Sequence, residues 1–123
     1  MADNRVVHFE IPADDPAKLA EFYTKLFGWK IEKIPVPNHD YWGCKTGEGM
    51  GIDGGIMKRV NPQQTVTNYT NVEQLDATLA QAKQLGAQVA LGKTPVAGMG
   101  WIAVAIDPQG NLFGLWQSDP GAK

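Results

Sequence analysis

Apolar and polar residues alternate in the first patterned segment of the chain. Over residues 6–11, one side of an extended strand would carry Val7, Phe9 and Ile11. The opposite side would carry His8 and Glu10, because successive side chains of a strand point to opposite faces. The pattern therefore predicts a strand that packs one face on a helix and turns its other face, with His8, toward something polar.

A helix with clear end signals follows this strand. Asp15 is a favourable N-cap, Pro16 suits the first helical position, and Gly28 predicts a left-handed C-cap. The apolar residues between these ends recur at helical spacing. We expect them to form one buried stripe of Leu19, Phe22, Tyr23, Leu26 and Phe27.

A second helix has the same kinds of signal. Thr70 or Asn71 predicts its N-cap, Glu73 or Gln74 would complete a capping box, and Gly86 predicts its end. Its apolar stripe comprises Val72, Leu75, Leu79, Ala82 and Leu85.

The two helices belong to a repeated unit, since each follows one strand-like segment and precedes three. The first set of strands is expected at residues 6–11, 29–34, 41–46 and 52–58, and the second at 65–70, 87–91, 100–106 and 111–117. The sequence thus predicts one α+β domain of two βαβββ modules, at residues 5–59 and 65–119, joined by a linker at 60–64. Two four-stranded sheets side by side would form a curved mixed sheet with a concave cleft and with the helices on the outer face.

Composition narrows the range of partners. The 123 residues carry a net charge of −2, and their lysines and arginines are scattered, which gives no basic stripe for nucleic acid. No secretory signal or membrane-spanning run is visible, and the single cysteine, Cys44, excludes an intrachain disulfide. We therefore expect a cytoplasmic protein whose partner is a small molecule or another protein chain.

Several motifs, taken in order, resemble the vicinal oxygen chelate superfamily, the group of glyoxalase I, bleomycin-resistance proteins, fosfomycin-resistance enzymes and extradiol dioxygenases. The resemblance covers nearly the whole chain. It rests on His8, Phe22-Tyr23, Phe27-Gly28-Trp29, Leu85-Gly86-Ala87 and the segment Asp107-Pro108-Gln109-Gly110-Asn111-Leu112-Phe113-Gly114-Leu115. It implies the same two-module fold and a homodimer, because chains of this family commonly pair.

The resemblance also implies up to four metal-ligand positions, of which this chain keeps one. His8 matches the first. The second falls near Thr65 or Thr67, and the fourth falls on Gly114, where the family's enzymes have glutamate. The strand that would supply the third has no Asp, Glu or His after Asp53. A catalytic zinc needs about three protein ligands, so we expect no metal cofactor, with a divalent ion held by His8 as the alternative.

The same positions define candidate ligand contacts. If Gly114 faces the cleft, alternation places Leu112 and Trp116 there as well. On the neighbouring strand, we expect Ile102, Val104 and Ile106 to face the core, and Trp101, Ala103 and Ala105 to face the cleft. The parity of strand 41–46 leaves open whether Tyr41 or Trp42 contributes. The aromatic rings could instead fill a core or a dimer interface.

Two functions from different classes remain. The first is binding of a small, partly apolar molecule between the modules without a metal, through His8, Glu10, Thr67, Trp101, Leu112, Gly114 and Trp116. The second is a metal-dependent lyase, isomerase or dioxygenase that uses His8, with Glu10 as its acid or base partner. A purely structural hydrogen bond from His8 to Glu10 or to a backbone carbonyl is the alternative to both.

Two further motifs carry no function. Residues 49–54 spell the G-x-G-x-x-G fingerprint, but a strand-like run follows instead of the helix that phosphate binding requires. Cys44 lacks a catalytic signature and is expected to be a small buried residue.

Overall fold

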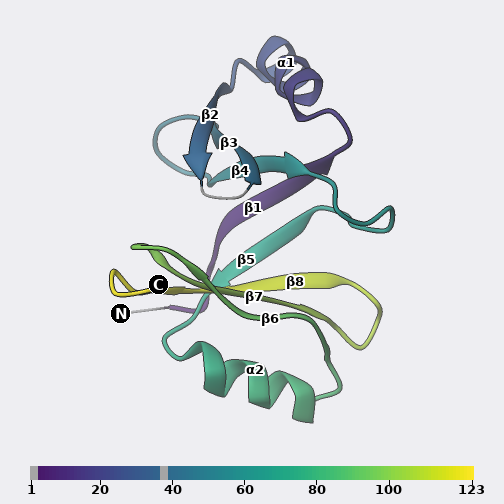
Figure 1. Cartoon of the computed structure of the whole chain (residues 1–123), viewed down its shortest axis with the longest axis vertical. Helices are drawn as coiled ribbons and strands as arrows, with labels where there is room; N and C mark the ends of the chain where they lie inside the picture. The colour runs from purple at the N-terminus through teal and green to yellow at the C-terminus, as the bar shows by residue number, and fades with distance from the viewer. Residues whose placement is uncertain (1–2, 37–38) are drawn as a thin grey trace. The chain divides into compact units, whose positions relative to one another are not determined.

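The computed structural model describes residues 3–36 and 39–123. Two compact units divide the chain: an N-terminal unit, His8–Val66, and a C-terminal unit, Thr67–Lys123, which also includes the segment up to Val7. The elements follow each other as two βαβββ modules (Figure 1), so the predicted α+β class and modular repeat are confirmed. Within the described residues, neither helix has the length and hydropathy that spanning a bilayer requires.

The N-terminal module contains a four-stranded mixed sheet in the order β2-β3-β4-β1. The strand β1 pairs with β4 in parallel, and the other neighbours are antiparallel. The elements of this module are β1 (Val6–Ala13), α1 (Pro16–Phe27), β2 (Lys30–Val36), β3 (His39–Lys45) and β4 (Asp53–Lys58).

Both ends of α1 lie where the sequence predicts them. The Asp15 carboxylate accepts a hydrogen bond from the Lys18 amide at 3.2 Å, which satisfies one of the unpaired donors of the first turn. Gly28 adopts φ 75°, and its amide donates to the Thr24 carbonyl at 2.9 Å. A residue with a Cβ atom adopts this left-handed conformation less readily, which explains the glycine.

The expected buried stripe of α1 is only partly buried. Leu19 and Tyr23 pack on the sheet around Ala13, Cys44 and Ile56, the buried centre of this unit. The exposed fractions of the other three side chains, Phe22, Leu26 and Phe27, are 54%, 57% and 58%. The prediction that all five residues are buried is therefore wrong, because the helix turns a narrower face to the sheet than its sequence pattern suggests.

The C-terminal module has the same arrangement, with strand order β5-β8-β7-β6 and a parallel pair β5 and β8. A turn at Asp107–Gly110 joins its last two strands, as predicted, and the Gly110 amide donates to the Asp107 carbonyl at 3.0 Å. The elements of this module are β5 (Thr67–Asn71), α2 (Leu75–Gln84), β6 (Gln88–Val96), β7 (Gly100–Ile106) and β8 (Leu112–Ser118).

The predicted cap of the second helix is wrong. Thr70 and Asn71 belong to β5, where Asn71 pairs with Trp116 of β8. The helix begins at Leu75, and its N-cap residue, Gln74, makes no side-chain capping bond. Instead, the side-chain oxygen of Gln117 accepts a hydrogen bond from the Leu75 amide at 2.7 Å. A residue distant in sequence therefore supplies the cap.

The predicted faces of β7 are also wrong. Residues opposite each other in an antiparallel ladder share a face, and β7 places Ala103 opposite Leu115. Both side chains are buried in the core beneath α2, with Trp101 packed against them. Trp101, Ala103 and Ala105 thus face the helix, and Ile102, Val104 and Ile106 lie on the other face. The prediction was wrong because it assumed that the branched residues of this strand, rather than its alanines, face the core.

Candidate functional site

A hydrogen-bonded cluster of three side chains lies on the sheet of the N-terminal unit, on the face away from α1. His8 and Glu10 come from β1, whose alternate residues Phe9 and Ile11 pack into the core beneath α1. The third member is Tyr41 of β3, whose hydroxyl lies 2.7 Å from Nε2 of His8. The Tyr41 hydroxyl also hydrogen-bonds the Glu10 carboxylate. We call these three residues the His8 cluster.

Glycine at position 55 allows this cluster to form. β4 lies between β3 and β1, so Tyr41 must cross β4 to reach its partners. Gly55 pairs with Glu10 on one side and with Gly43 on the other. A Cβ atom at position 55 would overlap the Tyr41 hydroxyl. Because Gly55 has no side chain, it leaves the space in which the tyrosine ring crosses β4 to reach β1.

The environment keeps both rings of the cluster neutral near pH 7. Burial lowers the pKa of His8, and the carboxylate of Asp53, its neighbour in the β1 and β4 ladder, opposes this only in part. Burial, and then the Glu10 carboxylate, raise the pKa of Tyr41 well above its usual range. His8 is thus a neutral imidazole, and Tyr41 is a protonated phenol.

The hydrogen bonds of the cluster have a defined direction. A carboxylate can only accept, so the Tyr41 hydroxyl donates its single proton to Glu10. The oxygen of Tyr41 then accepts from the Nε2–H of His8. In the neutral ring, this places the lone pair of His8 on Nδ1. The cluster is a directed chain of donors that ends at a carboxylate.

The donors present do not fit a metal site. Among the residues that the structure describes, no three His, Cys, Asp or Glu side chains are grouped closely enough to hold a metal ion. Nε2 of His8 contacts the Tyr41 hydroxyl and not another His, Cys, Asp or Glu side chain. A zinc ion requires about three protein ligands. We therefore derive no chemical step through a metal, and the expectation of a metal-free site stays a prediction.

Four other candidate contacts lie in the C-terminal unit. Tyr69 of β5 lies over Gly114, which the ladder places opposite Tyr69. By alternation along β8, the face that carries Gly114 also carries Leu112 and Trp116, as predicted, and alternation along β5 adds Thr67, which is 6% exposed. Their roles as ligand contacts, and the concave cleft expected from the resemblance, stay predictions.

Trp101, the remaining candidate, does not share that face. Its indole nitrogen donates to the Asp119 carboxylate at 2.9 Å, and the Lys93 ammonium lies 4.6 Å from its ring centre. The indole therefore packs against the core with its polar atom satisfied, so the expectation that Trp101 lies on the face of Gly114 is wrong.

The sequence reading left Tyr41 unresolved and did not single out Gly55. The parity of β3 is settled by its ladder with β4: Trp42 pairs with Ile56 in the core, and Tyr41 therefore faces the opposite side. Consecutive glycines inside a strand often mark a close approach by another group. Gly54 and Gly55 carry that signal, since Phe9 lies against the first and Tyr41 against the second.

Cys44 lies in the core, as expected. Its side chain is 2% exposed, and burial raises the pKa of the thiol to about 11. A thiol of this kind is protonated at neutral pH and is a poor nucleophile.

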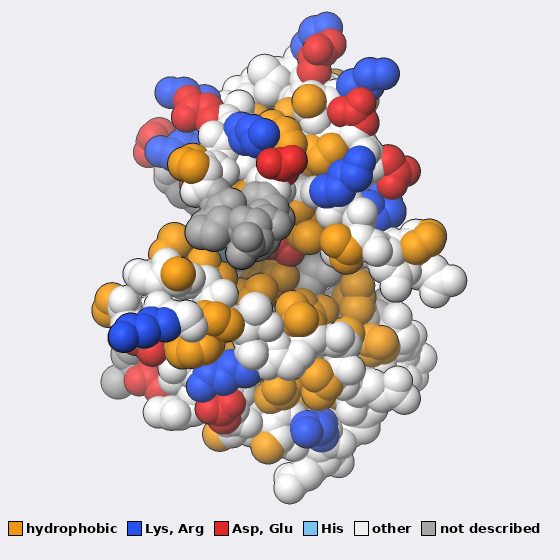
Figure 2. Space-filling view, in the orientation of Figure 1, with side chains coloured by type: hydrophobic (Ala, Val, Ile, Leu, Met, Phe, Trp, Pro, Cys, Tyr) orange, Lys and Arg blue, Asp and Glu red, His pale blue; other side chains and the backbone are white. Residues whose placement is uncertain are grey.

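Among the described residues visible in Figure 2, charged side chains of one sign do not gather in a patch. In Figure 2, lysine and arginine side chains are mixed with aspartate and glutamate, most densely over the N-terminal unit in the upper half of the view. Such mixing gives no continuous basic surface on this face for a nucleic-acid backbone.

Comparison with known proteins gives a family. The family model described as a glyoxalase-like domain matches residues 7–116. Anthracycline biosynthesis protein DnrV of Streptomyces peucetius is 25% identical, over 89% of this chain and 45% of that protein. A glyoxylase-like domain-containing protein of Didymella fabae is 30% identical, over 68% of this chain and 73% of that protein. The chain thus spans less than half the length of DnrV.

Solved structures with low sequence identity share the fold. A hypothetical protein from Bacillus halodurans has a TM-score of 0.73 at 14% identity, covering 98% of this chain and 99% of its own. Methylmalonyl-CoA epimerase from Mycobacterium tuberculosis has a TM-score of 0.71 at 14% identity, with 97% and 90% covered. The Streptomyces coelicolor epimerase in complex with 2-nitronate-propionyl-CoA has a TM-score of 0.69 at 18% identity, with 94% and 97% covered.

Proposed function

Since this chain belongs to the glyoxalase-like domain family, we propose that it binds a small, partly apolar organic molecule at the His8 cluster without a metal ion. The family match confirms the resemblance to the vicinal oxygen chelate superfamily that the sequence motifs indicate. The observation that carries the proposal is the contact of 2.7 Å between His8 Nε2 and the Tyr41 hydroxyl, continued by the hydrogen bond to Glu10.

The form of the cluster supports recognition of a ligand. Half-buried polar groups whose directions are fixed in advance lose little freedom when a ligand binds. The same strand face carries apolar surface, since Met57 pairs with Tyr41 and is half-buried. A hydroxyl or amine group on the ligand, which can donate a hydrogen bond to the acceptor atoms of this chain, would therefore suit the cluster, and the hydrocarbon part of the ligand would meet Met57.

The charges around His8 favour one chemical class. Glu10 and Asp53 carry carboxylates on the face that carries His8, and the imidazole of His8 is neutral. Like charges repel, so these groups disfavour a ligand with several phosphates and suit a neutral or cationic one. An anthracycline has ring hydroxyls, ketone groups and an amine, and relatives of this chain are named as anthracycline biosynthesis proteins. We propose an aromatic polyketide of this kind as the ligand class.

Calorimetric titration with the anthracycline doxorubicin tests the proposal. The protein is first treated with EDTA, and we expect saturable binding in a 1:1 ratio. Tyr41→Phe removes one hydroxyl while keeping the ring, and because it breaks the chain of hydrogen bonds, it should weaken the affinity by roughly 3- to 10-fold. Binding that needs an added metal ion, or that is the same in wild type and Tyr41→Phe, would contradict the proposal.

A matched variant and a second probe make the test specific. Tyr23→Phe deletes the same hydroxyl from a tyrosine of α1 that packs on the other side of the sheet, outside the His8 cluster, so its affinity for doxorubicin should match that of wild type. Methylmalonyl-CoA, the ligand in one structure of the epimerase, should bind more weakly than doxorubicin. Tighter binding of the CoA ester would reject the proposed ligand class and leave the site itself in place.

A further inference from the structure

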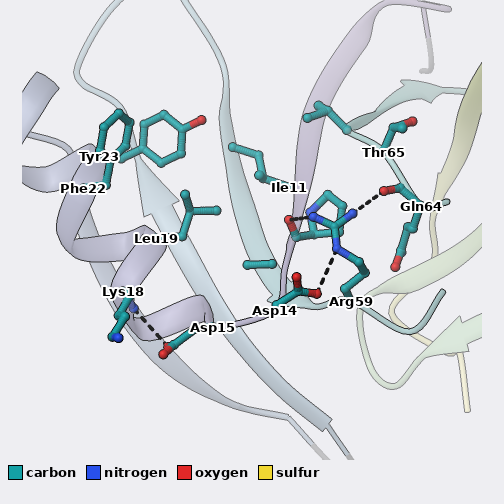
Figure 3. Close-up of a pocket in the computed structure, with 13 residues that line it drawn as sticks. Ile11, Asp14, Asp15, Lys18, Leu19, Phe22, Tyr23, Arg59, Gln64 and Thr65 are labelled. Atoms are coloured by element: carbon teal, nitrogen blue, oxygen red, sulfur yellow. Dashed lines mark hydrogen bonds and ion pairs between the residues drawn. The ribbon is translucent and has the colours of Figure 1, made fainter. Parts of the chain in front are cut away.

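A concave region that His8, Glu10 and Tyr41 do not line lies beside α1 in the N-terminal unit. It has a volume of about 700 Å³ and is bounded by the first turns of α1 on one side and by Arg59 and residues 64–66 on the other (Figure 3). Ile11 and Leu19 line it and also pack on the core beneath α1. The His8 cluster lies on the other face of β1, so this hollow is separate from the site proposed above. We call it the α1 hollow.

The walls of the α1 hollow present apolar surface to solvent. Phe22 lies on the α1 wall and Val66 lies at the end of the opposite segment, and each is 54% exposed. Figure 3 shows the helix with Leu19 and Phe22 on one side of the space and Arg59 and Gln64 on the other. A volume of this size is within the range of roughly 300–1,000 Å³ that is typical for small-molecule sites.

The Arg59 guanidinium and the Asp14 and Asp15 carboxylates at the rim are already engaged with the protein. The Arg59 guanidinium donates to the Asp14 carboxylate at 3.1 Å and to the Pro12 carbonyl at 3.3 Å. It also donates to the Gln64 carbonyl. On the other side, the Asp15 carboxylate caps the Lys18 amide. Two acidic and two basic residues line the hollow, so their formal charges cancel. The rim therefore offers little to an ion, and the walls favour contact with an uncharged molecule.

The exposed apolar residues of α1 are not a requirement of the fold. The module is repeated, and among the described residues with large exposed apolar side chains none lies within α2, although its C-cap residue, Leu85, is 72% exposed. The helix α1 has three, Phe22, Leu26 and Phe27. Only Phe22 of these lines the hollow. The sequence of α1 thus places an aromatic ring at this wall, whereas the described residues of α2 include no large exposed apolar side chain.

We propose that the α1 hollow is a second binding site, which takes a neutral molecule with an aromatic ring. The ring would pack against Phe22 and Leu19 on the helix side and against Val66 on the other. Aromatic rings contribute both buried apolar area and favourable edge or face contacts. Because this site uses none of the residues of the His8 cluster, it can be tested independently.

The test uses N-phenyl-1-naphthylamine, a neutral aromatic probe whose fluorescence rises when it leaves water. Wild type should give a saturable increase with one probe per chain. Phe22→Ala should raise the dissociation constant by roughly fivefold, because the main aromatic contact is lost. Leu26→Ala is the matched control, since Leu26 is equally exposed on the same helix but does not line the hollow. Its dissociation constant should stay within about twofold of wild type.

A second variant approaches the hollow from its other wall. Val66→Trp adds bulk at an exposed position, so it should fill part of the hollow and weaken the probe without unfolding the protein, which a thermal unfolding curve checks. Equal loss of binding in Phe22→Ala and Leu26→Ala would indicate general adhesion to the apolar helix surface and would overturn the proposal. Fluorescence that never saturates, or that is unchanged in both Phe22→Ala and Val66→Trp, would also overturn it.

Discussion

At the scale of single residues, the hydrogen bonds of the His8 cluster depend on which atoms carry protons. A neutral imidazole donates to a phenol, which donates to a carboxylate. Burial holds the imidazole and the phenol neutral, because it disfavours the charged form of His8 and the ionised form of Tyr41. The cluster can therefore fix the orientation of a ligand group without adding a positive charge to the face.

Burial of His8 makes the stability of the protein depend on pH. The pKa of His8 in the folded state is below 6.5, its value in the unfolded chain. As the pH falls through 6.5, the unfolded chain takes up a proton that the folded protein resists, so the free energy of unfolding decreases until the pH passes the folded pKa.

Urea unfolding at pH 7.5 and pH 5.5 checks this prediction. Wild type should lose more free energy of unfolding between the two pH values than His8→Gln, in which the titrating ring is absent. The comparison between the two proteins removes the contribution of other groups that titrate in this range. An equal loss in both proteins, or a gain for wild type at pH 5.5, would show that His8 is not held neutral by the fold.

The sequence could locate His8 and Glu10 but not their partner. Alternation along β1 is regular, so the face of each side chain follows from its position. Strand β3 carries Tyr41 and Trp42 side by side, and both rings are plausible core residues, so only the ladder with β4 decides between them. The face of Trp101 could not be predicted for the same reason. Trp101 shares one face of its strand with Ala103 and Ala105, and this pattern does not indicate which face is buried.

At the scale of elements, the position of the His8 cluster depends on β4. It lies between β3 and β1, and its two adjacent glycines admit Phe9 on the core face and Tyr41 on the other. A residue with a side chain at position 55 would displace the tyrosine from both of its partners.

Gly55→Ala should therefore destabilise the protein and disrupt the cluster. The new methyl group would overlap the Tyr41 hydroxyl, and forcing an extra carbon into a packed position costs typically about 1–3 kcal/mol. The matched control is Gly92→Ala in β6, where an added Cβ atom would meet nothing within 4 Å. Chemical denaturation measures both, and a loss in Gly55→Ala no larger than in Gly92→Ala would contradict the role given to Gly55.

The two helices show how far local sequence signals reach. The ends of α1 follow from residues beside them in sequence, Asp15 and Gly28, and both are read correctly. The start of α2 depends on Gln117, which lies on β8 and comes close only when the sheet has formed. A cap supplied by tertiary structure leaves no local pattern, which is why the sequence placed the helix start too early.

At the scale of the whole molecule, the repeat was the most predictable feature. Each module repeats one order of elements, and turn and cap residues mark the boundaries between them, so the α+β class and the two βαβββ modules follow without tertiary information. The repeat does not reveal how the two modules differ. The His8 cluster and the α1 hollow both lie in the N-terminal unit, and each depends on residues that have no counterpart in the C-terminal unit.

The resemblance to two-module proteins that pair predicts a homodimer. Sedimentation equilibrium at micromolar concentration should give twice the mass of one chain. Dilution to nanomolar concentration provides the control, because a true dimer dissociates by mass action as its concentration falls below the dissociation constant. A single species with the mass of one chain across this range would contradict the prediction.

The most direct test of ligand binding without a metal follows the ring of His8 itself. The chain has two histidines, so the protein labelled with ¹³C-histidine gives two imidazole signals, and the one lost in His8→Gln belongs to His8. In EDTA, doxorubicin should move the His8 signal along a saturable curve, with the same dissociation constant that calorimetry gives. A His8 signal that stays fixed while the protein is saturated with doxorubicin, or that moves only after a divalent metal ion is added, would contradict the account.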